Sequence, residues 1–205
     1  TVTVTDALGN AGSITIPDFV IDTTAPTVTE VTAITTPSND TTPSYVFNTT
    51  EAGTISSSLG FSSTTSAAAG NNTITFNPLA AGTYSGKTVT VTDAAGNAGS
   101  RTIPDFVIDT TAPSLTQVTA ITTPSNDTTP SYVFTTNEAG TITTNIAEGF
   151  STSNSATTGS NLTITFNTLP EGTYSGKTVT VTDALGNAGS ITIPDFVIDT
   201  TAPTV

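Results

Sequence analysis

Six acidic residues recur at matched positions and are the side chains best suited to chemistry. Each set has an Asp before Thr-Thr-Ala-Pro, a Glu before Ala-Gly, and an Asp opening the pattern Asp-Ala-x-Gly-Asn. Carboxylates grouped without basic neighbours favour Ca²⁺, which takes about six to eight oxygen ligands in flexible geometry, whereas Mg²⁺ suits an all-protein cage less well. Zn²⁺ would require His or Cys, and the chain has neither. The two sets are Asp22, Glu51 and Asp93, and Asp109, Glu138 and Asp183.

These sets belong to a long internal repeat. The phrase Thr-Val-Thr-Val-Thr-Asp-Ala begins at Thr1, Thr88 and Thr178, so its copies are 87 residues apart (from 1 to 88) and 90 residues apart (from 88 to 178). Such a period exceeds the 20–50 residues of solenoid repeats and suits a β-sandwich of about 100 residues with its own core. We therefore expect two whole repeats, 23–109 and 110–199, the last two strands of a preceding repeat at 1–22, and the start of another at 200–205.

The elements of each repeat are predicted to be β-strands. Thr alternates with Val, Ile or Phe, which places apolar side chains on one face and Thr on the other. Pro104 falls inside the last predicted strand and implies an edge position or a bulge there. The strands predicted for the first repeat are 27–34, 44–49, one from Thr54, 72–77, 87–92 and 100–108, with a weak edge strand within 56–70.

Strand direction brings each set of acids together. The first strand leaves the linker, the second returns, and the loop at 50–53 therefore lies at the linker end. The loop at 93–99 lies there too, because its two strands are antiparallel. Asp22, Glu51 and Asp93 should thus meet at one junction, with Gly96 free to adopt a positive φ in the tight turn. The alternative for each acid is an Asx turn without metal.

A second pair of polar residues occurs at the opposite end of each repeat. Asn39–Asp40 and Asn126–Asp127 lie in the loop between the first two strands, and this loop faces the next linker. They could add further ligands for a cation. An ordinary Asx turn is the competing interpretation of both pairs.

Composition argues against several classes of function. Three basic residues accompany sixteen acidic ones, for a formal net charge of -13. Nucleic acid and anionic membrane surfaces are not expected as partners, because both require Lys or Arg patches. No apolar run has the length of a membrane span, so no membrane insertion is expected in this segment. Without His or Cys, and without a nucleophile–base pair, the sequence does not predict an enzyme.

The recurring motifs resemble a known family. Val-Thr-Asp-Ala-Ala-Gly-Asn, the following Ile-Asp-Thr-Thr-Ala-Pro and the intervening Glu-Ala-Gly-Thr are similar to bacterial Ig-like tandem repeats of giant secreted and surface adhesins. The resemblance implies tandem Ig-like β-sandwich domains arranged end to end and export to the bacterial cell surface. It also implies Ca²⁺ at the domain junctions, held by the six acids named above. The stretch between the strand that starts at Thr54 and the strand at 72–77 is unusually rich in Ser and Thr, so the number of middle strands stays open.

Two functions are compatible with these features. The first is a calcium-stiffened stalk or filament of a long extracellular adhesin, which mediates surface attachment or biofilm formation. Its partners would be neighbouring repeats, with lateral self-association through the uncharged segment 56–70. The alternative is a module that recognises carbohydrate or another surface, including ice, and this would need an exposed aromatic cluster or a polar pocket.

Overall fold

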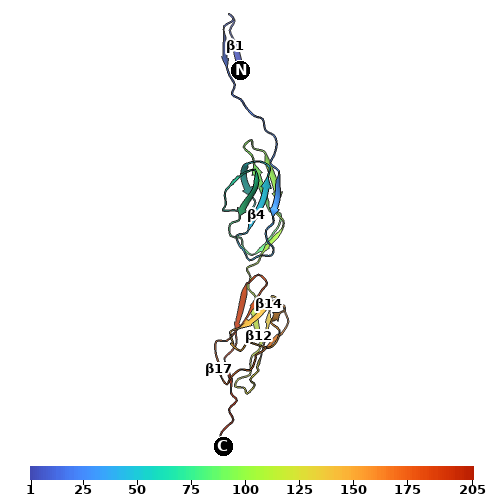
Figure 1. Cartoon of the computed structure of the whole chain (residues 1–205), viewed down its shortest axis with the longest axis vertical. Helices are drawn as coiled ribbons and strands as arrows, with labels where there is room; N and C mark the ends of the chain where they lie inside the picture. Colours follow the sequence, from blue (N-terminus) through green and yellow to red (C-terminus); the bar gives the residue numbers. More distant parts are fainter. The chain divides into compact units, whose positions relative to one another are not determined.

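The computed structural model describes all residues from Thr1 to Val205, and every regular element is a β-strand (Figure 1). The all-β class predicted from the sequence is thereby confirmed. The chain divides into two compact units, which are discontinuous in sequence. Unit 1 contains 1–34, 44–77 and 85–104, and unit 2 contains 35–43, 78–84 and 105–205. The predicted repeats are continuous, and their boundaries stay a prediction.

Unit 1 has a hairpin and two larger sheets. The hairpin joins β1 (Val2–Thr5) to β2 (Ala11–Ile14). The three-stranded sheet has the order β3 (Val28–Thr32), β4 (Ser44–Thr49) and β7 (Gly70–Thr75). The four-stranded sheet has the order β10 (Ala98–Thr102), β9 (Thr88–Thr92), β5 (Gly53–Ser57) and β6 (Ser66–Ala67).

Unit 2 repeats this pairing pattern and adds two-stranded sheets. Its three-stranded sheet has the order β12 (Leu115–Thr119), β13 (Ser131–Thr136) and β16 (Leu162–Thr165). Its four-stranded sheet has the order β15 (Ser155–Ala156), β14 (Gly140–Thr144), β18 (Thr178–Thr182) and β19 (Ala188–Thr192). The two-stranded sheets pair β8 (Gly82–Tyr84) with β11 (Phe106–Ile108), and β17 (Gly172–Tyr174) with β20 (Phe196–Ile198).

One apolar core in unit 2 is built from all its larger sheets. Side chains alternate between buried and accessible along β13 and β18, as the Thr-rich pattern predicts. The buried cluster takes Phe134 from β13, Ile142 from β14, Ile164 from β16 and Val181 from β18, together with Phe196 from β20. Apolar faces of separate sheets that share a core are consistent with a β-sandwich.

The predicted strands agree with the structure except near the prolines. The strand 44–49 is confirmed as β4, and the weak edge strand within 56–70 is the two-residue β6. The single strand predicted at 100–108 is wrong, because β10 pairs with β9 whereas β11 pairs with β8. Pro104 separates the two segments, and it has no backbone N–H to continue a ladder. The short strand β8 lies between the predicted strands 72–77 and 87–92, where no strand was predicted.

Candidate metal centre

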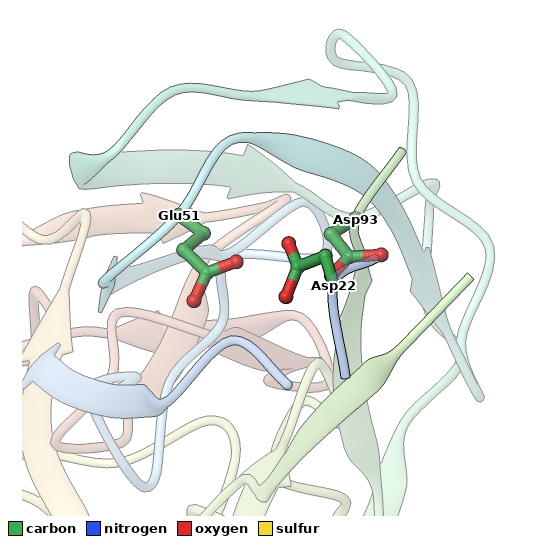
Figure 2. Close-up of side chains that lie close together, drawn as sticks. All are labelled: Asp22, Glu51 and Asp93. Carbon is green, nitrogen blue, oxygen red and sulfur yellow. The ribbon is translucent and has the colours of Figure 1, made fainter. Parts of the chain in front are cut away.

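Asp22, Glu51 and Asp93 come together in unit 1, as their strand directions predict. Each offers one carboxylate oxygen, and these three oxygens lie within 4.8 Å of one another. Figure 2 shows the Asp22 carboxylate between those of Glu51 and Asp93. Asp22 belongs to a linker (22–26), whereas Glu51 precedes β5 and Asp93 follows β9. Three separate segments therefore supply the cluster.

The turn after β9 holds Asp93 in place. Asp93 Oδ1 accepts a hydrogen bond from the Asn97 backbone N–H at 2.8 Å, and Oδ2 accepts one from Asn97 Nδ2 at 2.9 Å. These bonds, the Asn97 side chain foremost, hold the pKa of Asp93 below its ordinary value of 3.8. Gly96 adopts a φ of 95° in this turn, which confirms the expected need for glycine. The carboxylate therefore stays ionised in mildly acidic solution.

Asn97 also reaches the linker, and sequence reasoning did not single it out. Its Nδ2 donates a second hydrogen bond, of 3.1 Å, to the backbone carbonyl of Asp22. A signal was present, because an Asn closes the same turn at 10, 97 and 187. The turn itself requires only the Asp and the Gly, so the recurring Asn indicated a role beyond forming the turn.

The linker packs directly on β10. A Cβ atom added to Gly99 would overlap the carbonyl oxygen of Pro26, whose residue is buried. Gly99 thus permits an approach that no other residue type would allow. Together with the Asn97 bond, this packing fixes the path of the linker beside the cluster.

The donor set suits a hard cation. Asp22 Oδ1 accepts a hydrogen bond from the Thr24 backbone N–H at 3.0 Å, so the Asx turn weighed as the alternative is present as well. The Asp22 Oδ2 atom and the Glu51 carboxylate have no such protein donor. All-oxygen donors without His or Cys match Ca²⁺ better than Zn²⁺. The Asx turn and a metal are therefore compatible at Asp22.

The second set lies in unit 2 and is less closely grouped. Asp109, Glu138 and Asp183 line one depression of about 270 Å³. Their carboxylate oxygens do not form a three-membered group as close as the first, since only Asp22, Glu51 and Asp93 do so. The supporting network is nevertheless the same, because Asn187 Nδ2 donates to Asp183 Oδ2 at 2.8 Å and to the Asp109 carbonyl at 3.2 Å.

The loop 35–43 contributes to this second depression. Pro37 lines it, and Asn39 Nδ2 donates a hydrogen bond of 2.6 Å to the Leu185 carbonyl. Asn39 therefore meets the turn next to Asp183, but as a hydrogen-bond donor. Asp40 forms an Asx turn with the Thr42 backbone N–H at 2.9 Å.

The equivalent pair in the other loop behaves in the same way at its Asp. Asp127 Oδ1 accepts the Thr129 backbone N–H at 2.9 Å, and it also accepts the Thr129 hydroxyl at 3.1 Å. Asn126 precedes this turn and forms no side-chain hydrogen bond. The geometry at Asp40 and Asp127 is that of the competing Asx interpretation.

Aromatic side chains are placed mainly in the interior. Tyr45, Phe47, Phe76 and Phe106 are fully buried, as are their equivalents in the second repeat. Burial and the nearby Glu30 carboxylate raise the pKa of Tyr45 to about 12. These rings are therefore not available as a platform for carbohydrate.

Comparison of the sequence with protein-family models finds no match, and comparison with curated proteins finds none either. The fold and the site define a class: an all-β protein in which carboxylates from a linker and two loops gather in one place. The structure contains no helix that could span a membrane.

Proposed function

We propose that this chain is a structural segment of tandem Ig-like β-sandwich repeats, from a long adhesin, stalk or filament secreted to the bacterial cell surface. Calcium at the linkers stiffens it, and the assembly mediates attachment or biofilm formation. The observation that carries the proposal is the meeting of the Asp22, Glu51 and Asp93 carboxylates within 4.8 Å. The repeat supplies the same three residue types a second time.

The spacing of the oxygens is compatible with one shared ion. Calcium–oxygen distances are about 2.3–2.6 Å, so two ligands on opposite sides of Ca²⁺ lie roughly 5 Å apart at most. The three oxygens of the first cluster fall within that limit. An ion held there would bind Asp22 of the linker to loops that precede β5 and follow β9. It would therefore reduce the freedom of the linker.

The residues around the cluster already restrict the linker, so a bound ion would add to an existing constraint. The linkers contain Pro26 and Pro113, whose fixed φ restricts the backbone before any ion binds. Asn97 and the Asp93 turn hold one ligand in place. Extracellular calcium modules bind with dissociation constants of about 10⁻⁴–10⁻³ M, and a partly preformed, exposed carboxylate site suits that range.

Calorimetry and small-angle X-ray scattering of the full chain test this function together. We expect saturable Ca²⁺ binding at millimolar concentration, little binding of Mg²⁺, and a larger maximum dimension in Ca²⁺ than in EDTA. No heat of binding, or a scattering profile unchanged by EDTA, would remove calcium stiffening from the proposal. The carbohydrate or ice alternative predicts hits on a glycan array or thermal hysteresis, and no specific observation favours it.

A further inference from the structure

Thr49 and Thr136 carry the only polar side chains that are buried in this structure. They are 1% and 3% exposed, and every other buried side chain is apolar. The two residues occupy the same position of the repeat, 87 residues apart (from 49 to 136). A buried hydroxyl that recurs at one position indicates a role that an apolar side chain would not perform.

Both threonines end a strand and face the core. β4 buries every second side chain, namely Tyr45, Phe47 and Thr49, and β13 repeats this pattern. Val has nearly the same branched shape as Thr, so it would fill the position without burying a hydroxyl. Burial of a hydroxyl costs free energy unless a hydrogen bond compensates for the lost water. The partner of the hydroxyl therefore decides what the threonine does.

The partner in each repeat is the backbone of a candidate metal ligand. Thr49 Oγ1 donates a hydrogen bond of 3.0 Å to the Glu51 carbonyl oxygen, and Thr136 Oγ1 donates one of 3.0 Å to the Glu138 carbonyl oxygen. The Thr136 hydroxyl also accepts the Glu138 backbone N–H at 3.4 Å. Figure 2 shows the Glu51 carboxylate extending toward that of Asp22. The hydroxyl thus fixes the backbone from which this side chain extends.

The residue between the threonine and the glutamate binds the linker. Thr50 Oγ1 accepts the Thr27 backbone N–H at 2.9 Å, and the Thr50 N–H donates to the Thr27 carbonyl oxygen at 3.2 Å. In the second repeat Asn137 and Ser114 form the same two bonds, at 2.6 and 3.2 Å. The loop 50–52 is therefore held from the core by Thr49 and from the linker by Thr50.

We propose that Thr49 and Thr136 are positioning residues: each hydroxyl holds the loop that follows it against the linker, and thereby directs Glu51 or Glu138 toward the other carboxylates. The hydroxyl itself contacts no carboxylate and acts through the backbone of the glutamate. The effect on cation binding rests on the proposed function, whereas the hold on the loop does not.

Amide hydrogen exchange in EDTA tests the hold on the loop without any cation. The probe is the Thr27 N–H, because it is bonded to Thr50 Oγ1. We expect Thr49→Val to speed its exchange at least about fivefold by local opening, and Thr49→Ser, which keeps the hydroxyl, to have little effect. The Ser114 N–H is a reference in the same sample, since Thr136 is unchanged. Unaltered exchange at Thr27 in Thr49→Val would overturn the proposal.

Calorimetric titration with Ca²⁺ tests the effect on the first cluster, in a Glu138→Gln background that weakens the second set. We expect Thr49→Val to lower the affinity at least about threefold, because ligand placement tunes such sites. Thr49→Ser removes a buried methyl group, so its unfolding midpoint in EDTA should fall while the affinity stays that of the parent. If affinity falls in step with the midpoint in both variants, Thr49 has only a structural role and the proposal is overturned.

Thr29→Val is the matched control, since Thr29 lies exposed on the neighbouring strand β3. We expect it to change neither exchange at Thr27 nor the affinity for Ca²⁺, and effects equal to those of Thr49→Val would contradict the proposal. A parent chain that binds no Ca²⁺ would remove the proposed function. Faster exchange at Thr27 in Thr49→Val would even then support the hold on the loop, so the two ideas fail separately.

Discussion

Asn97 and Asp22 are 75 residues apart in the chain, yet the Asn97 side-chain amide donates a hydrogen bond of 3.1 Å to the Asp22 carbonyl oxygen. The same relationship joins Asn187 to Asp109, 78 residues apart, at 3.2 Å. In both places the linker is attached to the turn by protein groups alone. A cation at the carboxylates would reinforce an attachment that already exists.

The Asn187 attachment contributes to stability. Asn187→Ala removes the side-chain hydrogen bond that joins the turn to the Asp109 carbonyl of the linker in unit 2, and a second one to Asp183 within the turn. Losing about one net hydrogen bond should lower the melting temperature of a repeat of this size by roughly 4–8 °C, measurable by calorimetry. Asn10→Ala is the matched control, since Asn10 bonds only within its own turn. An equal effect of both variants would show that the linker bond has no importance.

Calcium affinity should depend on the cluster and not on overall charge. Glu51→Gln removes one ligand charge, and we expect the affinity measured by calorimetry to fall roughly tenfold or more, because ligand charge tunes such sites. Asp18→Asn makes the same change in net charge at an exposed residue outside the cluster and should leave affinity unchanged. If Asp18→Asn weakens binding as much as Glu51→Gln, calcium is not bound at these three residues.

A methyl group added at the glycine of this strand should destabilise the fold only where the linker packs against that glycine. Gly189→Ala would place a Cβ atom on the Pro113 carbonyl oxygen, and Gly12→Ala at the matched position would meet nothing within 4 Å. We expect Gly189→Ala to destabilise unit 2 by several kcal/mol, since backbone on both sides must shift. Gly12→Ala should melt like the parent chain. Chemical denaturation of the two variants gives the comparison, and similar midpoints would contradict the close approach.

Acid should remove part of the stability of the second turn. Burial acts to raise the pKa of Asp183, but the hydrogen bonds from Asn187 and from backbone N–H groups outweigh it and hold the pKa below 3.8. A lowered folded-state pKa means that the stabilisation is complete above the unfolded value and is lost as pH falls through the folded value.

The measurement is the difference in melting temperature between the parent chain and Asp183→Asn, taken from about pH 7 to pH 2. We expect the parent's advantage to be constant above about pH 5 and to shrink progressively below it. The subtraction cancels the relief of general repulsion among the acidic residues on acidification. A difference that does not change with pH would show that Asp183 is not stabilised in its ionised form.

Much of the fold and the site was predictable from local patterns. Alternation of Thr with Val predicted the strand at 87–92 to within one residue of β9, and the strand predicted at 44–49 has its observed bounds. Matched acids and antiparallel strand directions predicted the meeting of Asp22, Glu51 and Asp93. Both inferences depend on properties that a strand carries by itself, namely its two-residue period and its direction.

The division of the last predicted strand was not predictable in the same way. Pro104 indicated an irregularity, but whether the chain bends or changes sheet depends on which strand accepts Phe106–Ile108. The partner is the short β8, which pairs with β11 through only three residues. It is too short to show the alternation of apolar and polar side chains from which a strand is predicted. Which strand such a short segment pairs with depends on the tertiary packing around it.

The sequence by itself determined an all-β chain with a repeat of about 90 residues and two matched sets of acids, because these features follow from residue type and spacing. Only the tertiary structure decided that the carboxylate oxygens of the first set lie within 4.8 Å of one another while those of the second set are less closely grouped. It alone assigned Asn97 to the linker. The physical reason is that proximity and burial depend on what the rest of the chain places beside a residue, which local sequence does not specify.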